Sequence, residues 1–101
     1  MSSAVNMVKR GSVVGSGAAK KVVLGFKPAV VHLHNVDGLV SVYKTDSMED
    51  DKAMKEVTAG TKTYPASLVT IESDGFTIGT DADLNVDGER IEYTAWQARN
   101  E

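Results

Sequence analysis

The feature that most constrains the fold is a two-residue hydrophobic alternation in the segment from Gly75 to Trp96. Alternation that includes threonine, isoleucine, tyrosine and tryptophan favours β-strands over a helix. The Asp87-Gly88 pair in its middle tolerates the positive φ of a tight turn, and Gly75 after Asp74 is expected to behave in the same way. The segment is therefore predicted to be a β-hairpin that buries one face, with these inward residues: Phe76, Ile78, Ala82 and Leu84 on the first arm, and Ile91, Tyr93 and Ala95 on the second.

Shorter pieces of the same pattern occupy the rest of the chain. Strands are predicted over residues 4–10, 20–26, 30–34, 39–44 and 67–73, separated by turn residues that include the glycine-rich segment 11–17 and Pro28. At most one short helix is expected, near residues 46–57, where Asp46 and Glu49 have the spacing of a capping box; the alternative for this segment is a long solvated loop. The pattern predicts an all-β protein with an antiparallel β-sandwich or jelly-roll-like fold.

The 101 residues are expected to form one domain, with residues 1–10 as an N-terminal arm or strand. The composition, 42% hydrophobic and 25% charged, is ordinary for a globular protein. No apolar run approaches the roughly 20 residues of a transmembrane helix, and no secretory signal is expected. The sequence has no cysteine, which excludes disulfides and cysteine-based metal sites.

Charge is distributed unevenly along the chain, whose net charge is −3. Residues 1–28 contain no acid, whereas residues 72–101 contain eight acids and two arginines. This asymmetry predicts either a basic strand beside an acidic one in the same sheet, or complementary surfaces between identical subunits. Nucleic-acid binding is not expected, because Lys20 and Lys21 lack the basic-aromatic surface of single-strand binders.

Four segments, in this order and spacing, resemble a small β-sandwich module of virion structural proteins from tailed bacteriophages: Gly25–Val31 (GFKPAVV), Asp74–Gly79 (DGFTIG), Leu84–Gly88 (LNVDG) and Ile91–Trp96 (IEYTAW). The likeness covers about residues 11–97 and is weakest in the middle. It implies an assembly component of the virion, often a homotrimer. Because no fibre shaft or collagen-like repeat is present, the chain resembles a capsid decoration protein that binds the exterior of the major capsid protein shell. The alternative is a tail-associated receptor- or carbohydrate-binding module of the same fold.

An acidic segment has part of the spacing of a calcium loop. Asp83, Asn85 and Asp87, followed by glycine, supply oxygen ligands at alternate positions, and Asp81 lies two residues earlier. Thr94 occupies the twelfth position, where a bidentate glutamate is needed. The alternative interpretation is an acidic, solvated strand face that leads into a turn, and no cofactor is predicted.

His32 and His34 form the second candidate metal site. Both are expected on the strand face opposite to Val31 and Leu33. On a threefold axis, three such pairs could supply six imidazoles to a transition metal, an arrangement that the resemblance to phage proteins brings into consideration. The alternative is a pair of exposed or inter-subunit histidines without a metal, because two histidines alone make an incomplete site.

Trp96 is out of phase with the inward residues of its strand. It is predicted either to cover a sheet edge within the subunit or to anchor a protein interface, where aromatic residues are enriched. The candidate interface residues are Trp96, Lys9, Arg10, Lys20 and Lys21. No nucleophile elbow, metalloprotease helix or paired-carboxylate motif is present, so the chain is not expected to be an enzyme.

Overall fold

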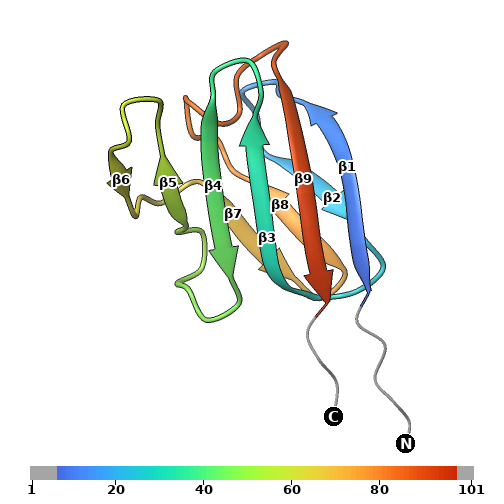
Figure 1. Ribbon diagram of the computed structural model, residues 1–101. Helices are drawn as coiled ribbons and strands as arrows, with labels where there is room; N and C mark the ends of the chain where they lie inside the picture. The colour runs from blue at the N-terminus through green and yellow to red at the C-terminus, as the bar shows by residue number, and fades with distance from the viewer. Residues whose placement is uncertain (1–6, 98–101) are drawn as a thin grey trace, which may run out of the picture.

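The computed structural model describes residues 7–97, and in that range the chain forms two packed antiparallel sheets without any helix (Figure 1). The larger sheet has the order β1-β9-β3-β4-β5-β6, and the smaller has the order β2-β8-β7. The prediction of an all-β, antiparallel sandwich is therefore confirmed. The strands are β1 (Val8–Val14), β2 (Lys20–Val23), β3 (Pro28–Asn35), β4 (Val40–Thr45), β5 (Met54–Glu56), β6 (Lys62–Thr63), β7 (Val69–Glu72), β8 (Gly75–Ile78) and β9 (Arg90–Gln97).

The hydrophobic core lies between the two sheets. Every second side chain of the central strands points into it, such as Val31 and Leu33 on β3 and Phe76 on β8, all of which are buried. Phe76 contacts Tyr93 of β9 edge to face, with ring centroids 5.4 Å apart, which joins the two layers. The other face of the larger sheet is therefore free to carry polar and aromatic residues.

The predicted hairpin from Gly75 to Trp96 is wrong. Strand β8 pairs with β2 and β7, whereas β9 pairs with β1 and β3, so the two arms belong to different sheets. The chain between them crosses from one sheet to the other, which leaves Ala82 exposed while Leu84 is buried in the core. The alternation correctly predicted most of the buried side chains, but burial does not specify which strands pair.

No helix forms near residues 46–57, the one segment where the sequence allowed a short helix, and the chain there makes turns followed by strand β5. The buried ammonium of Lys44 donates hydrogen bonds to the backbone carbonyls of Glu49, Asp50 and Lys52, at 2.7, 2.7 and 2.6 Å. A helix would direct these carbonyls along its axis, whereas here they converge on one cation. Lys44 thus organises the loop that the capping pattern assigned to a helix.

The N-terminal segment also differs from the prediction. Residues 11–14, expected in turns, belong to strand β1, while residues 4–6 of the predicted first strand lie outside the described range. Gly11 leaves room in this strand for the Tyr93 ring, because a Cβ atom there would lie 2.7 Å from the hydroxyl oxygen of Tyr93, which would have to move. The glycine accommodates an aromatic ring on the neighbouring strand rather than a turn.

Gly88 adopts a φ of +83°, as predicted, and a Cβ atom there would meet no atom within 4 Å. Gly88→Val should therefore lower the free energy of unfolding by about 1–2 kcal/mol through backbone strain alone. Denaturant unfolding measures this loss. Gly88→Asn is the matched control, since asparagine tolerates positive φ, and it should retain most of the stability. Equal midpoints for the valine variant and the wild type would contradict the prediction.

Candidate binding face

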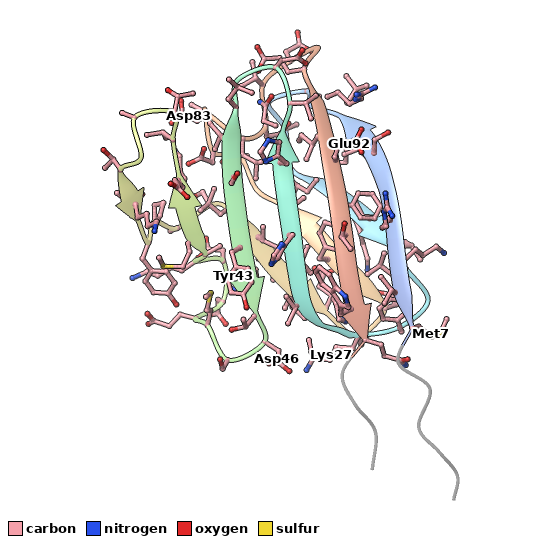
Figure 2. The ribbon with its side chains drawn as sticks, in the orientation of Figure 1. Met7, Lys27, Tyr43, Asp46, Asp83 and Glu92 are labelled. Carbon is pink, nitrogen blue, oxygen red and sulfur yellow. The ribbon has the colours of Figure 1, made fainter. Side chains whose placement is uncertain are left out.

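The candidate site is the outer face of the six-stranded sheet, which points away from the three-stranded sheet (Figures 1 and 2). Strand register fixes its composition, because residues opposite one another on adjacent strands project from the same face. One row crosses five strands in succession, through Arg10, Thr94, His32, Tyr43 and Met54. This surface is called the outer face below.

Three aromatic rings meet at the centre of the outer face. The imidazole of His32 contacts Tyr43 and Trp96 edge to face, with centroids 4.6 and 5.1 Å away. His32 is exposed at the surface of the face but partly desolvated, which lowers its pKa, so the imidazole is neutral near pH 7. Tyr43 remains 41% exposed, and Trp96 is half-buried. Trp96 lies on the face opposite to the core residues of its strand, as its phase predicted.

A groove of about 460 Å³ lies over β3, β4 and β5 beside these rings. Its polar walls carry both signs of charge, with Arg10 and Lys62 as cations and Glu56 and Glu92 as anions. The Tyr43 ring forms an aromatic wall of the groove and is held in place by its edge-to-face contact with His32. The groove therefore combines an aromatic surface with charged groups, which suits non-covalent recognition.

Ser41 and His34 form the nearest approach to a catalytic pair on the outer face. The Ser41 hydroxyl lies 2.9 Å from Nδ1 of His34. Within residues 7–97, the second nitrogen of this ring has no hydrogen-bonded carboxylate that would orient it as a general base. The geometry thus supplies a polar contact between the two side chains.

Asn85, one of the candidate calcium ligands, has a structural role. Its side-chain oxygen accepts hydrogen bonds from the backbone N–H groups of Ser16 and Gly17, at 2.9 and 3.1 Å. Its amide nitrogen donates to the carbonyls of Ala18 and Gly79, at 2.8 Å each. All its hydrogen-bonding capacity is committed to joining two loops, which leaves no oxygen lone pair for a cation.

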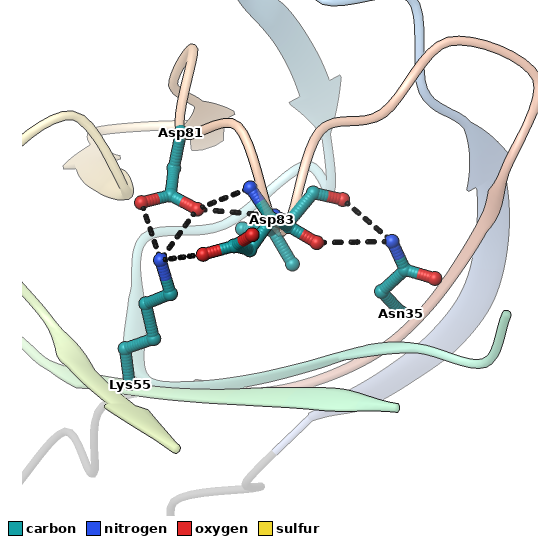
Figure 3. A network of polar contacts seen from close by, with 5 residues as sticks. Asn35, Lys55, Asp81 and Asp83 are labelled. Carbon is teal, nitrogen blue, oxygen red and sulfur yellow. Dashed lines mark hydrogen bonds and ion pairs between the residues drawn. The ribbon is translucent and has the colours of Figure 1, made fainter. Parts of the chain in front are cut away.

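Asp81 and Asp83 surround the ammonium of Lys55 (Figure 3). The Lys55 Nζ atom lies 3.0 Å from Asp81 Oδ2 and 2.6 Å from Asp83 Oδ2. Burial alone would lower the pKa of Lys55, but the hydrogen bonds with Asp83 and Asp81 raise it, so the amine is charged. A lysine thus occupies the position that the spacing assigned to calcium, while Asp87 is exposed and makes no third contact with it.

The histidine pair lies as the alternation predicted, with His32 and His34 both exposed on the outer face. Their roles differ, since His32 packs against aromatic rings and His34 hydrogen-bonds to Ser41. Nowhere in the described part of the chain do three or more histidine or acidic side chains gather in a metal-binding cluster.

The four basic interface candidates lie in different places. Lys21 pairs with Glu72 and Asp74, at 3.0 and 2.9 Å, so a basic strand does lie beside acidic residues of the same sheet. Lys20 is exposed at the start of β2 in the smaller sheet, and the Lys9 ammonium donates to the Leu24 carbonyl at 3.5 Å.

Arg10 alone of these four shares the outer face with Trp96. The sequence analysis missed Tyr43, Met54 and Glu92, which complete the face. A signal for Tyr43 was present, because it alternates with the buried residues Val42 and Lys44.

No protein-family model matches the chain, and no curated protein or solved structure matches it either. Among residues 7–97, no helix is long and apolar enough to span a membrane.

Proposed function

We propose that the protein is a bacteriophage virion structural protein that decorates the capsid exterior, binding the major capsid protein shell through the outer face. The observation that carries this proposal is the cluster of Trp96, His32 and Tyr43 at the centre of a sheet. Partly exposed aromatic rings with arginine beside them are the residues that protein interfaces favour. The order of the four resembling segments supports the phage context.

The outer face suits repeated assembly on a shell. Rings that already pack against each other lose little side-chain freedom on binding, which lowers the entropic cost of association. Charged groups of both signs around the cluster provide specificity and exclude water from its rim. Each contact can be modest, because a symmetric shell offers many copies of the same site and bridged sites reinforce one another.

Trp96→Ala tests the proposal. The variant should fold, because the indole lies outside the core, but its affinity for purified empty shells should fall by about 2 kcal/mol, or roughly 30-fold. Co-sedimentation with shells measures bound protein. Val23→Ala is the matched control, because Val23 is 64% exposed on the smaller sheet, and it should bind normally. Undiminished shell binding by the tryptophan variant would contradict the proposal.

A second candidate function is carbohydrate recognition in the groove. The specific observation is Tyr43, whose exposed ring lies among hydrogen-bonding groups that include Ser41, Glu56 and Glu92. An aromatic ring can stack on a pyranose while carboxylates bind its hydroxyls. The deciding comparison measures Tyr43→Ala and Trp96→Ala on shells and on host cells. Loss of cell adsorption with unchanged shell occupancy would replace the decoration proposal with this one.

A further inference from the structure

Strand β1 is the longest edge strand of the sandwich. It has seven residues, against four in each of β2 and β7 and two in β6, the other edges. Within residues 7–97, β1 pairs with β9 on one side and with no strand on the other, where it forms the right-hand edge in Figure 1. An edge of this length is a template for adding a further strand.

The free backbone groups of β1 can be assigned from its register with β9. Gly15 donates to the Glu89 carbonyl and Gln97 donates to the Met7 carbonyl, each at 2.8 Å, at the two ends of the ladder. Hydrogen-bonded residues alternate in an antiparallel pair, so the odd-numbered residues of β1 bond to β9. The even-numbered residues direct their N–H and C=O groups to the free edge and their side chains to the outer face: Val8, Arg10, Ser12 and Val14.

We propose that β1 pairs antiparallel with β1 of a second copy of this chain, centred on Gly11, to form a two-fold symmetric dimer. In this register each of the four outward residues lies opposite another outward residue: Val8 faces Val14 of the second copy, and Arg10 faces Ser12 of the second copy. The two valines, 52% and 54% exposed in the single chain, then cover each other. The two larger sheets become continuous, and the outer faces join into one surface.

Charge selects this register over its neighbours. Across the dimer, Arg10 is followed by Ser12 and then Glu92 of the second copy, because Ser12 lies opposite Glu92 within each chain. Adjacent strands are about 4.8 Å apart, so the Arg10 and Glu92 backbones are about 10 Å apart across a small serine. Their extended side chains can span that distance, so Arg10 would join the ion pair that Glu92 already makes with Arg90 of its own chain at 3.2 Å, and symmetry makes two such clusters.

Registers shifted by two residues bring cations together. One shift places Arg10 opposite Arg10 of the second copy. The other places Arg10 opposite Val14, whose neighbour on β9 is Arg90. Lys9 does not interfere, because its side chain points to the other side of the sheet, toward Leu24. A strand that pairs with itself about a two-fold axis closes with two copies, so the expected unit is a dimer rather than the trimer implied by the resemblance.

Disulfide trapping tests the register, and the absence of cysteine from the sequence makes it free of background. An equimolar mixture of Val8→Cys and Val14→Cys chains should form a cross-linked heterodimer under mild oxidation, because these positions face each other. Each variant alone should stay uncross-linked, since equal positions lie about 20 Å apart in this register. Non-reducing electrophoresis and mass spectrometry give the result. Cross-linking of Val8→Cys with itself, or none in the mixture, would overturn the proposal.

Sedimentation of the purified full chain over a range of concentrations tests the contact itself. The wild type should be in monomer–dimer equilibrium. Arg10→Glu should weaken the dimer by about tenfold or more, by facing Glu92 of the second copy, and the double variant Arg10→Glu, Glu92→Arg should restore it. Ser12→Pro should abolish it, because proline removes an edge N–H that makes no bond within the subunit. Val23→Lys, on the edge of the smaller sheet, is the control and should dimerise normally.

A wild type that is purely monomeric or trimeric would overturn the proposal, as would charge reversal without effect or without rescue. Circular dichroism of each variant separates loss of the dimer from loss of the fold. The inference does not depend on the proposed function, because sedimentation uses the protein alone. If Trp96→Ala bound shells normally, the proposed function would fail but the dimer proposal would not. If the purified chain did not dimerise, the dimer proposal would fail but the proposed function would not.

Discussion

Gly75→Ala is expected to lower the free energy of unfolding by about 3 kcal/mol or more, the largest loss from adding a single methyl group to this chain. Gly75 opens β8, the central strand of the smaller sheet, and it is buried. A Cβ atom there would lie 2.0 Å from the carbonyl oxygen of Val22 on β2. Neither the new Cβ atom nor the Val22 carbonyl can rotate away, because both are fixed by the backbone. The clash can be relieved only if β2 and β8 move apart, which breaks the hydrogen bonds between them.

Chemical denaturation monitored by circular dichroism measures this loss. Gly60→Ala is the matched control, since Gly60 has a φ of +85° and a Cβ atom there would meet nothing within 4 Å. The control should lose only about 1 kcal/mol, from backbone conformation. If Gly75→Ala unfolded at the same denaturant concentration as the wild type, the pairing of β2 with β8 would be wrong.

The same glycine illustrates how far the sequence could predict the fold. Gly75 follows an aspartate, and the Asp-Gly pair predicted a turn with positive φ at the glycine. The turn is present, at Ser73 and Asp74 between β7 and β8, but Gly75 itself begins the strand, and only Gly88 of the two predicted glycines has positive φ. The sequence shows only that residue 75 has no side chain. Glycine is needed at this position because β2, a strand some fifty residues earlier in the chain, approaches it closely.

Alternation predicted burial better than pairing for a related reason. Phe76, Ile78 and Ile91 are buried as their phase required. Strand pairing depends on contacts between distant parts of the chain, and β9 pairs with β1 and β3 near the N-terminal end of the sequence. The face on which Trp96 lies was predicted correctly, because its departure from phase is a local property of its own strand.

The side chains of the acidic segment, weighed as calcium ligands against a solvated alternative, are engaged by groups that are distant in sequence. Lys55, which lies between Asp81 and Asp83, is 26 and 28 residues away from them. Asn85 is bound by backbone groups 68 and 69 residues earlier. The spacing of oxygen ligands along a loop cannot reveal a lysine or a pair of N–H groups that the fold brings from elsewhere in the chain. In this protein those groups occupy the oxygen atoms that the motif would offer to a cation.

Lys44→Met is the second substitution expected to have a large effect, with a loss of about 3 kcal/mol. Lys44 is 1% exposed, and its ammonium donates all three of its hydrogens to the carbonyls of Glu49, Asp50 and Lys52. Methionine has a similar shape but no donor, so it would leave three carbonyls without this partner and remove the charge that gathers them. These carbonyls lie in the segment where the capping pattern allowed a helix, so this loop is where the consequence of the substitution should be measured.

The loss should therefore have a local signature as well as a global one. Amide hydrogen exchange should accelerate most in residues 46–53, whose turns Lys44 holds, and less in the core strands. Lys52→Met is the matched control, because the Lys52 ammonium is more exposed and lies 3.7 Å from Glu49, so its loss should cost about 0.5 kcal/mol or less. If Lys44→Met and Lys52→Met behaved alike in denaturation and exchange, the carbonyl cluster would have no organising role, and another cause would be needed for the absence of the helix.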